Sequence, residues 1–532
     1  MTEEESASRT FLEGALYSIA TIVQIIVQVA TVMYLGRVLG PENYAIYSFS
    51  LLPSYFLLTF ADIGLSGALL RYSSVYRAEN EWEALISVSK FALGISLASS
   101  AISMAILVAI PEPLSNSLTN RKGLGAYVVL TAPYIAATLI TSVSLSLAAA
   151  LRRSKGRSLA LVMASLGRLL ATVALISIGL SVTGAVLGAT LGSILGCMVS
   201  VAVVRDIIFR RETHASFMDK AGFLKLALSL YSASLLTGVL ERLLSINLGY
   251  LTSAVPEGNF LAGNFQAAFN FLGSVLAIYG SLAVPFVPYI SEVLYSDKEK
   301  QVILGKITLL STTLLMISTP LSIFAIFFSQ DLIRTVYGSA YTVAHIFFAI
   351  LSLPLVIWPF SAMLGNFIQV VNDKKAIITS SLTAFVSGLI GLYILPNQFG
   401  LLGLALARSV YSTVPTIFLL LYARRRYEVK VDYLSFLTAL AISAISGGMA
   451  YWLTWHLKVS IVRLVIGLVL ELALYTTLMA ALVPRSELFI HLLSAISERS
   501  PYTKILVQPL VRYYNAIRKL ISPRGREGKQ EQ

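Results

Sequence analysis

Long apolar runs separated by short polar breaks make up most of this chain. A helix needs roughly 20 apolar residues to cross a bilayer core about 30 Å thick, and each run reaches about that length. The first run follows an acidic leader and is too long for the apolar segment of a cleaved signal peptide, so we expect it to stay attached as a helix. The pattern predicts fourteen membrane-spanning helices, at residues 11–36, 43–70, 84–110, 124–150, 158–180, 183–205, 222–249, 259–289, 303–328, 341–370, 376–395, 399–422, 433–454 and 459–483.

The composition excludes a soluble multidomain enzyme. Of the 532 residues, 56% are hydrophobic and 13% are charged, and the mean hydropathy is +0.78. Soluble proteins carry about 25% charged residues. The one cysteine, Cys197, lies in an apolar stretch, so we expect no disulfide framework, no metal site and no redox cofactor.

The basic residues are distributed as in a membrane protein rather than a nucleic-acid binder. The formal net charge is +13. When the connections between spans are numbered in turn, the N-terminus, the even connections and the C-terminal tail hold 30 Lys and Arg residues, and the odd connections hold five. Cytoplasmic loops collect Lys and Arg, so this asymmetry predicts that both termini are cytoplasmic and that nucleic acid is not a partner.

Short motifs recur along the chain in the same order. Leu35-Gly36 and Pro41-Glu42 follow the first span, and Leu248-Gly249 and Pro256-Glu257 follow the seventh, at offsets of 213 and 215 residues. Three further pairs have similar offsets: Pro133 with Pro354, Gly184 with Gly400, and Gly188 with Gly403. A duplication of six spans gives both copies the same orientation, so we expect two lobes related by a parallel repeat, with substrate bound between them.

The predicted architecture is therefore an all-α integral membrane protein of about fourteen helices. Residues 1–210 form the first six-helix lobe, 211–427 the second, and 428–483 two extra helices. The tail 484–532 mixes Leu and Ile with Lys and Arg, which predicts either a basic amphipathic helix on the inner leaflet or a partly disordered segment.

The segments LGRVLGPENYAIYSF and ADIGLSGALLRYSSVY resemble the opening of polysaccharide-exporter proteins, the O-antigen and lipid-linked oligosaccharide flippases of the multidrug/oligosaccharidyl-lipid/polysaccharide exporter superfamily. The resemblance covers about residues 10–100, with Ala45 where the family pattern often has Gly. It implies a plasma-membrane flippase that moves a polyprenyl- or dolichyl-pyrophosphate-linked oligosaccharide to the outer leaflet by alternating access. Its implied partners are this lipid, the surrounding membrane lipids and glycan-assembly enzymes.

Basic residues inside predicted spans are the first candidates for binding a diphosphate. Arginine suits this ligand because its planar guanidinium donates two hydrogen bonds to phosphate oxygens and keeps its charge. Inside spans we select Arg168, Arg242 and Arg408, whose alternative role is to satisfy helix-end carbonyls or a buried acid. Arg37 and Arg71 follow the resemblance motifs and are candidates for gating or headgroup capture, with ordinary membrane-edge roles as the alternative. Lys90 and Arg463 lie near span ends, where we expect structural roles.

Uncharged amides and buried acids complete the candidate site. Gln24 and Gln28 are one turn apart, and Asn259, Gln266 and Asn270 share one helical face. These amides are expected either to bind sugar hydroxyls or to form hydrogen bonds between helices. Asp62 and Glu241 are candidates for coupling to H⁺ or Na⁺, with a salt bridge as the alternative for Asp62. Glu471 is chemically similar but lies outside the repeat.

We expect no catalytic residues. Neither Gly-Lys pair is followed by Ser or Thr, so the chain lacks a GxxxxGK[ST] phosphate-binding loop for ATP. One alternative function is a drug or metabolite/cation antiporter on the same fold, which would need an acid-dominated cavity. A second alternative, from another class, is a membrane glycosyltransferase or polysaccharide polymerase, which would need paired acids on a large external loop.

Overall fold

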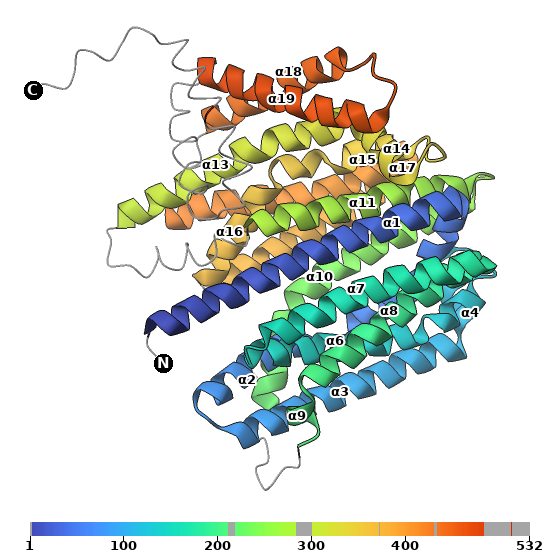
Figure 1. Cartoon of the computed structure of the whole chain (residues 1–532), viewed down its shortest axis with the longest axis vertical. Helices are drawn as coiled ribbons and strands as arrows, with labels where there is room; N and C mark the ends of the chain where they lie inside the picture. Colours follow the sequence, from blue (N-terminus) through green and yellow to red (C-terminus); the bar gives the residue numbers. More distant parts are fainter. Residues whose placement is uncertain are drawn as a thin grey trace, which may run out of the picture. The chain divides into compact units, whose positions relative to one another are not determined.

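The computed structural model of the protein describes residues 3–210, 219–283, 300–371, 373–429, 433–482 and 512. Within these ranges the chain is helical and contains no strand, which confirms the predicted all-α class. Figure 1 shows the helices coloured along the sequence. The predicted amphipathic tail, residues 484–532, lies outside the described residues apart from Arg512.

The helices of the first half of the chain run from the N-terminus to α11. Their bounds are α1 (Glu3–Ala61), α2 (Leu65–Ala78), α3 (Trp82–Ala109), α4 (Pro111–Thr119), α5 (Gly125–Leu130), α6 (Ala132–Ala150), α7 (Ser154–Leu175), the π-helical turn η1 (Ile176–Leu180), α8 (Ser181–Val203), α9 (Arg205–Ile208), α10 (Lys220–Ser253) and α11 (Gly258–Ala283).

The helices of the second half begin at α13. Their bounds are α13 (Lys300–Phe327), α14 (Ser329–Tyr337), α15 (Ala344–Leu351), the 3₁₀ turn η2 (Leu353–Val356), α16 (Trp358–Val370), α17 (Lys374–Tyr427), α18 (Tyr433–Leu453) and α19 (Ser460–Leu482).

The chain divides into two compact units. Unit 1 comprises Met1–Ser281, Val336–Phe347 and Ile377–Pro415, and unit 2 comprises Leu282–Thr335, Phe348–Ala376 and Thr416–Gln532. In unit 1, α10 packs against α1 and α2 and therefore joins the helices of the predicted first lobe. The lobe boundaries that the sequence repeat suggests, at 210, 427 and 483, stay predictions.

Glycines break the three longest continuous helical stretches, which are α1, the stretch from α7 through η1 to α8, and α17. Gly40 in α1, Gly179 in η1 between α7 and α8, and Gly400 in α17 have φ values of 68°, 94° and 56°. Residues with a Cβ rarely adopt this left-handed region, whereas glycine enters it readily. Gly40 lies between the spans expected at 11–36 and 43–70, whereas Gly179 and Gly400 lie within two residues of the ends of the spans expected at 158–180 and 399–422.

In the part of the chain that the structure describes, eight helices are long and apolar enough to cross a membrane. Three bent helix pairs bring that number to eleven if each pair is one span. Counting each glycine-broken helix as two spans would give the fourteen that the pattern predicts. The number of spans stays a prediction, because length and composition alone define these candidates.

Two predicted spans are interrupted in the structure. The span expected at 43–70 ends at Ala61, and α2 starts separately at Leu65 after a turn in which Gly64 has a φ of 72°. Asp62 was expected inside this span and instead lies in that turn. The span expected at 341–370 is divided into α15, η2 and α16, with Pro354 in the first turn of η2, because proline cannot donate a backbone hydrogen bond within a helix.

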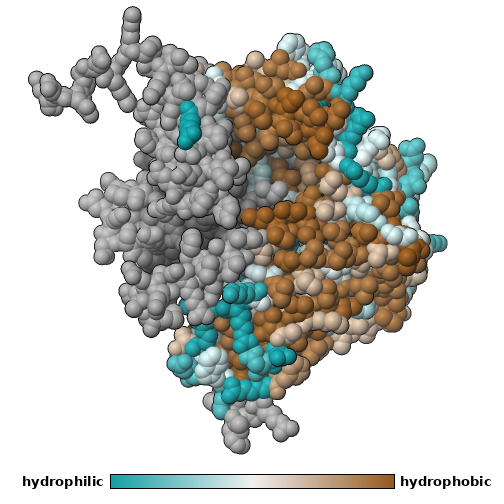
Figure 2. Space-filling model, viewed as in Figure 1, coloured by the Kyte–Doolittle hydropathy of each residue, from teal (hydrophilic) through white to brown (hydrophobic). Residues whose placement is uncertain are grey.

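The sides of the helices carry many exposed apolar side chains. Leu170, Ile178 and Met198 on α7, η1 and α8 are 66%, 73% and 63% exposed. On the face drawn in Figure 2, hydrophobic residues cover the sides of the helices and hydrophilic residues gather toward their ends. Large exposed apolar surfaces are costly in water, so this surface fits contact with lipid.

Small residues allow α7 and α8 to pack side by side along their lengths (Figure 1). A Cβ atom added at Gly188 of α8 would lie 2.7 Å from the Cα and 2.8 Å from the amide nitrogen of Thr172 in α7. These distances are too short for any side chain, and Thr172 is itself fully buried. Gly188 is therefore required for the close approach of the two helices.

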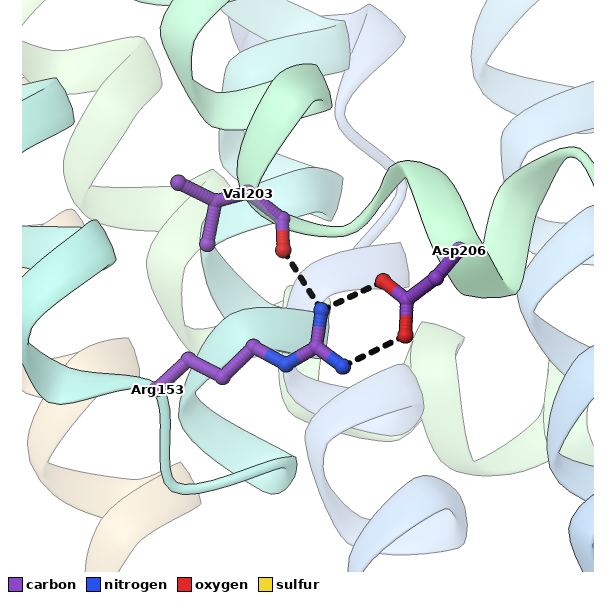
Figure 3. A network of polar contacts seen from close by, with 3 residues as sticks. All are labelled: Arg153, Val203 and Asp206. Carbon is purple, nitrogen blue, oxygen red and sulfur yellow. Dashed lines mark hydrogen bonds and ion pairs between the residues drawn. The ribbon is translucent and has the colours of Figure 1, made fainter.

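The connection after α6 is fixed to α9 by an ion pair and to the end of α8 by a hydrogen bond (Figure 3). The guanidinium of Arg153 donates to both carboxylate oxygens of Asp206, at 2.5 and 2.6 Å, and to the carbonyl oxygen of Val203 at 2.6 Å. These hydrogen bonds hold the pKa of Asp206 below its ordinary value. The side chains of Arg153 and Asp206 are 35% and 55% exposed. An ion pair this exposed contributes little to stability, so it positions the connection more than it stabilises the fold.

In unit 2, α13 and α19 both pack against α18. Arg463 of α19 pairs with Asp331 of α14 at 3.1 Å, and both side chains are about nine-tenths buried. The guanidinium carbon also lies 4.4 Å from the ring centre of Tyr451 and 5.3 Å from that of Trp455. These contacts fit the structural role expected for Arg463.

We predict that Gly188→Ala destabilises the protein by about 1–3 kcal/mol, because the added methyl group would overlap the backbone of Thr172. Thermal unfolding of the purified protein in detergent measures this effect. The matched control is Gly94→Ala in α3, where nothing lies within 4 Å of the added Cβ. This control should leave stability unchanged or raise it by up to about 1 kcal/mol, because alanine favours helix. Equal unfolding temperatures for the two variants would contradict the packing argument.

Candidate functional site

Unit 1 contains a cavity of about 480 Å³ whose wall carries charged, amide and tyrosine side chains. One face of each half of α1 contributes to the wall, together with residues of α7, α10, α11 and α17. The residues with polar groups in the wall are Gln24, Gln28, Thr31, Tyr44, Tyr47, Ser48, Tyr55, Ser165, Arg168, Glu241, Arg242, Ser245, Gln266, Asn270 and Arg408.

Arg168 of α7 reaches the cavity from the α7 and α8 pair. Its Nη2 donates a hydrogen bond of 2.6 Å to the hydroxyl oxygen of Tyr47. Its Nε is buried and has no hydrogen-bond acceptor among the described residues. Insertion of an arginine near the centre of a membrane helix costs about 2.5–3.5 kcal/mol, and a tyrosine hydroxyl is a neutral acceptor that leaves the guanidinium charge uncompensated.

Arg408 of α17 is the cavity arginine that has an acidic partner. Its Nη2 lies 3.2 Å from a carboxylate oxygen of Glu241 in α10, and the two side chains are 13% and 24% exposed. Its guanidinium carbon lies 4.7 Å from the ring centre of Tyr411. Glu241 is thus held in the cavity wall by a neighbouring helix rather than by the adjacent residue in its own helix.

Arg242 points to a different neighbour from Glu241, as expected for adjacent helical positions that lie about 100° apart. Its guanidinium carbon lies 5.1 Å from the ring centre of Tyr55, within the range of a cation–π interaction. The Nε atoms of Arg242 and Arg408, like that of Arg168, are buried without an acceptor in the described part of the chain. Arg168 and Arg242 therefore line the cavity with no described acid paired to them, whereas Arg408 is paired with Glu241.

The amides predicted on the first and eighth spans mostly line the cavity. Gln24, Gln28, Gln266 and Asn270 are all in its wall. Asn270 donates a hydrogen bond of 2.9 Å to the hydroxyl oxygen of Tyr44, so one amide already bonds between helices. For Gln24, Gln28 and Gln266, both sugar binding and hydrogen bonds between helices stay predictions.

The sequence interpretation omitted the tyrosines. Tyr44, Tyr47 and Tyr55 all line the cavity, and their positions i, i+3 and i+11 put them on one face of α1 after its break at Gly40. This spacing was available in the sequence as the signal of a shared face. The hydroxyl of Tyr47 holds Arg168 and the ring of Tyr55 holds Arg242.

Four predicted site residues lie outside the cavity. Asn259 accepts a hydrogen bond of 2.9 Å from Arg121 and so belongs to a helix end rather than to the polar face of α11. Arg37 donates to the carbonyl oxygen of Val336 at 3.1 Å. Arg71 is exposed on α2, and Asp62 lies in the turn before it, because the helix ends at Ala61. No described residue forms an ion pair with Asp62, and the salt-bridge alternative stays a prediction.

Arg121 joins two helix ends in unit 1 that the topology prediction puts on the outer side. Its guanidinium donates to Asn259, to Thr252 at 2.9 Å and to the carbonyl oxygen of Gly249 at 3.1 Å. Partial burial lowers its pKa to about 10, so it stays protonated at neutral pH. Nearby, Asn120 donates to Ser253 at 2.7 Å. We call this contact between residues 117–121 and 249–259 the α4–α10 seam.

A second contact at the predicted outer side involves the break in α1. The hydroxyl of Tyr341 donates to the carbonyl oxygen of Gly36 at 3.0 Å, and Tyr337 donates to Ala267 at 2.8 Å. The ring centre of Tyr44 lies 5.9 Å from that of Tyr337 and 6.3 Å from that of Tyr341. Buried aromatic rings thus stand behind the cavity wall at Tyr44.

The chemistry of the cavity favours an anion. Three arginines and one glutamate give the wall a net charge of +2, and one arginine is neutralised by the glutamate. Two guanidinium groups beside neutral amides and hydroxyl groups can bind phosphate oxygens while the amides bind uncharged hydroxyl groups.

Comparison with known proteins gives a family match over residues 12–294, more than half of the chain, to the polysaccharide biosynthesis protein family. A probable low-salt glycan biosynthesis flippase, Agl15 of Haloferax volcanii, is 23% identical over 218 residues. That match covers 41% of this chain and 46% of the relative, so the chain spans about half the length of the curated relative it matches.

Solved transporter structures share the fold. The lipid II flippase MurJ, in an inward closed conformation, superposes with a TM-score of 0.68 at 18% identity and covers 88% of this chain and 100% of its own. An inward-facing multidrug resistance MATE family transporter of the MOP superfamily gives a TM-score of 0.59 at 14% identity, over 77% of this chain and 98% of its own. At these identities the similarity establishes the fold.

We predict that Glu241→Gln increases the affinity of the cavity for inorganic pyrophosphate by about 30-fold, the factor that corresponds to about 2 kcal/mol. The change removes the negative charge beside Arg408, and at a separation of roughly 7 Å one unit charge is worth about 2 kcal/mol in a protein environment. The same change should lower the unfolding temperature, because Arg408 loses its ionic partner. Isothermal titration calorimetry and thermal unfolding measure the two effects. Asp62→Asn is the control, since Asp62 lies outside the cavity, and equal affinities in the two variants would contradict an anion site here.

Proposed function

The chain belongs to the polysaccharide biosynthesis protein family, and from this we propose that it is a flippase that moves a pyrophosphate-linked oligosaccharide lipid from the inner to the outer leaflet. The carrier would be a polyprenyl or dolichyl chain that stays in the bilayer while the headgroup crosses through the protein. A charged headgroup cannot cross hydrocarbon alone, because each charge or unpaired hydroxyl group costs several kcal/mol there.

The cavity in unit 1 carries this proposal. Arg168 and Arg242 would bind the diphosphate, since both line the cavity and neither is paired with an acid among the described residues. Arg408 would join them once Glu241 releases it. Gln24 and Gln28 of α1 and Gln266 and Asn270 of α11 would bind the sugar hydroxyl groups.

Alternating access is the transport mechanism that we propose for this cavity. The α4–α10 seam supports it, because side-chain and backbone hydrogen bonds of Arg121 and Asn120 hold together the ends of helices that the repeat assigns to different lobes. These hydrogen bonds are few and lie near the surface, so exchange with water can replace them when the lobes separate. Arg37 would contribute to the same closure through its bond to Val336.

Glu241 is the acid that we propose for coupling to H⁺ or Na⁺ within the cavity. Binding of either cation would compete with Arg408 for the carboxylate and so free this arginine for the diphosphate. Asp62 is the weaker candidate, since it does not line the cavity.

The proposed setting is the plasma membrane with both termini in the cytoplasm, as the distribution of Lys and Arg predicts. Membrane lipids would surround the exposed apolar helix faces. Enzymes that assemble or use the glycan are the proposed partners, because they must supply the lipid on one side and consume it on the other.

We predict that Arg168→Ala and Arg242→Ala each slow the movement of a pyrophosphate-linked oligosaccharide lipid by tenfold or more. The loss of a hydrogen bond to a charged group costs about 1.5–3 kcal/mol, which corresponds to roughly this factor. Purified protein in liposomes is assayed by the access of an impermeant sugar-modifying reagent to the lipid.

Lys90→Ala is the matched control, because Lys90 is a basic residue of a predicted span that lies outside the cavity and donates to the carbonyl oxygen of Arg210. It should keep the wild-type rate. Wild-type rates in both arginine variants would contradict the proposed binding of the diphosphate by Arg168 and Arg242. A wild-type protein that moves no lipid but accumulates an organic cation would favour the antiporter, and one that transfers sugar would favour the glycosyltransferase.

We predict that a crosslink across the α4–α10 seam stops transport. Asn120→Cys and Ser253→Cys, made in a Cys197→Ser background, put two thiols where the native side chains are in hydrogen-bond contact. Oxidation should abolish lipid movement and a reducing agent should restore it, because the lobes must separate there. Each single variant treated in the same way is the control. Transport by the fully crosslinked protein would show that this seam does not open.

A further inference from the structure

A fully buried acid in unit 2 has no part in the cavity described above. Glu471 lies in the middle of α19 and is 0% exposed. Neither of its carboxylate oxygens has a hydrogen-bond partner among the described residues. Ionisable residues inside membrane helices are costly to keep and commonly mark pathways for ions or protons.

The helices around Glu471 make room for its side chain. α18 packs against α19, and Gly447 of α18 faces the carboxyl group. A Cβ atom added at Gly447 would lie 3.2 Å from Oε1 of Glu471 and 2.8 Å from the Cγ2 of Ile323 in α13. The hydroxyl groups of Ser443 and Ser446 on α18 donate to backbone carbonyls of their own helix, so they do not bind Glu471.

No cation in the described part of unit 2 reaches this acid. The described side chains of α13, from position 312 onward, contain no ionisable group, and those of α18 contain only Tyr433 and Tyr451. In α19 the other ionisable groups are Arg463 and Tyr475. Arg463 is eight residues away, about 12 Å along the helix, and pairs with Asp331 at 3.1 Å. Tyr475 donates its hydroxyl to the carbonyl oxygen of Met316 at 2.8 Å.

The absence of a described partner determines the protonation state of the Glu471 carboxyl. A buried neutral carboxyl without a partner costs about 1–3 kcal/mol, whereas an ionised one without a partner costs several kcal/mol more, even after local relaxation. The group therefore minimises its free energy by holding a proton. Glu241 differs in this respect, because Arg408 compensates its charge.

We propose that Glu471 is a proton-binding site, protonated in this conformation, and that its exchange of a proton with water, rather than proton binding at Glu241, couples a proton gradient to transport. When α18 and α19 separate enough to admit water, the carboxyl releases its proton to one side of the membrane and becomes a carboxylate. It takes up a proton again from the other side before the helices close. The coupling rests on the flippase function proposed above, whereas the protonation does not.

Infrared difference spectroscopy of wild type and Glu471→Gln tests the protonation. The wild-type protein at neutral pH should show a carboxylic C=O stretching band at the high frequency typical of a carboxyl without hydrogen bonds, and Glu471→Gln should lack it. Slow exchange in D₂O should accompany the band, because the group is buried. A wild-type spectrum that shows only a carboxylate signal for this residue would overturn the proposal.

Transport in liposomes tests the coupling. A gradient of one pH unit is worth a factor of ten for a process coupled to one proton, so the steady-state ratio of lipid between leaflets should shift by up to about tenfold in wild type. Glu471→Gln should still move lipid, and its ratio should not respond to the gradient. A ratio that still responds in Glu471→Gln but not in Glu241→Gln would assign coupling to the cavity and overturn it for Glu471.

A substitute variant and the infrared band distinguish failure of the Glu471 proposal from misfolding and from failure of the flippase proposal. If Glu471→Gln does not fold, because its amide also lacks partners, then Glu471→Met replaces it as an apolar side chain of similar length. If wild type moves no lipid at all, the flippase proposal fails, and the infrared band still decides whether Glu471 holds a proton.

Discussion

A charge inside a bundle of apolar helices needs a partner, and the structure satisfies this constraint in a different way at each buried charge. Among the described residues, Arg408 has a carboxylate at 3.2 Å, whereas the partner of Arg168 is a tyrosine hydroxyl at 2.6 Å and that of Arg242 is a tyrosine ring. Arg463 in unit 2 combines an aspartate with aromatic rings. The degree of compensation separates groups that hold the fold from groups that remain available to a ligand.

The cavity of unit 1 depends on this partial compensation. Full neutralisation of its arginines would make a stable wall with little affinity for a diphosphate, and no compensation would destabilise the bundle. Tyrosines provide an intermediate solution, because a hydroxyl or a ring holds a guanidinium without cancelling its charge. Tyr47 and Tyr55 do this for Arg168 and Arg242, and Tyr44 on the same face of α1 accepts a hydrogen bond from Asn270.

The scaffold around the cavity is built from close helix contacts and glycine breaks. Gly188 lets the backbones of α7 and α8 approach, and Gly40, Gly179 and Gly400 turn long apolar stretches into separate helices. In a membrane these breaks are tolerated where polar groups or turns satisfy the freed backbone. Residues of α1 and α17, which contain such breaks, line the cavity together with residues of α10.

The sequence by itself determined the fold class and the family. Apolar runs of about 20 residues leave few alternatives to helices in a membrane, and the motifs at residues 35–76 gave a resemblance that the family match over residues 12–294 confirms. The sequence also indicated which charges lie inside helices, because an arginine within such a run is visible without a structure. Arg168, Arg242 and Arg408 were found in this way, and all three line one cavity.

Only the tertiary structure decided the partners of these charges. The pairing of Glu241 with Arg408 joins residues 167 positions apart, and helical periodicity contains no information about which helices face each other. Asn259 shares a face with Gln266 and Asn270 by periodicity, yet Arg121 from a distant connection binds it at the helix end. Asp62 left the predicted span because a turn at Gly64 ends the helix. Local pattern fixes which residues share a helix face, and packing between helices fixes what that face meets.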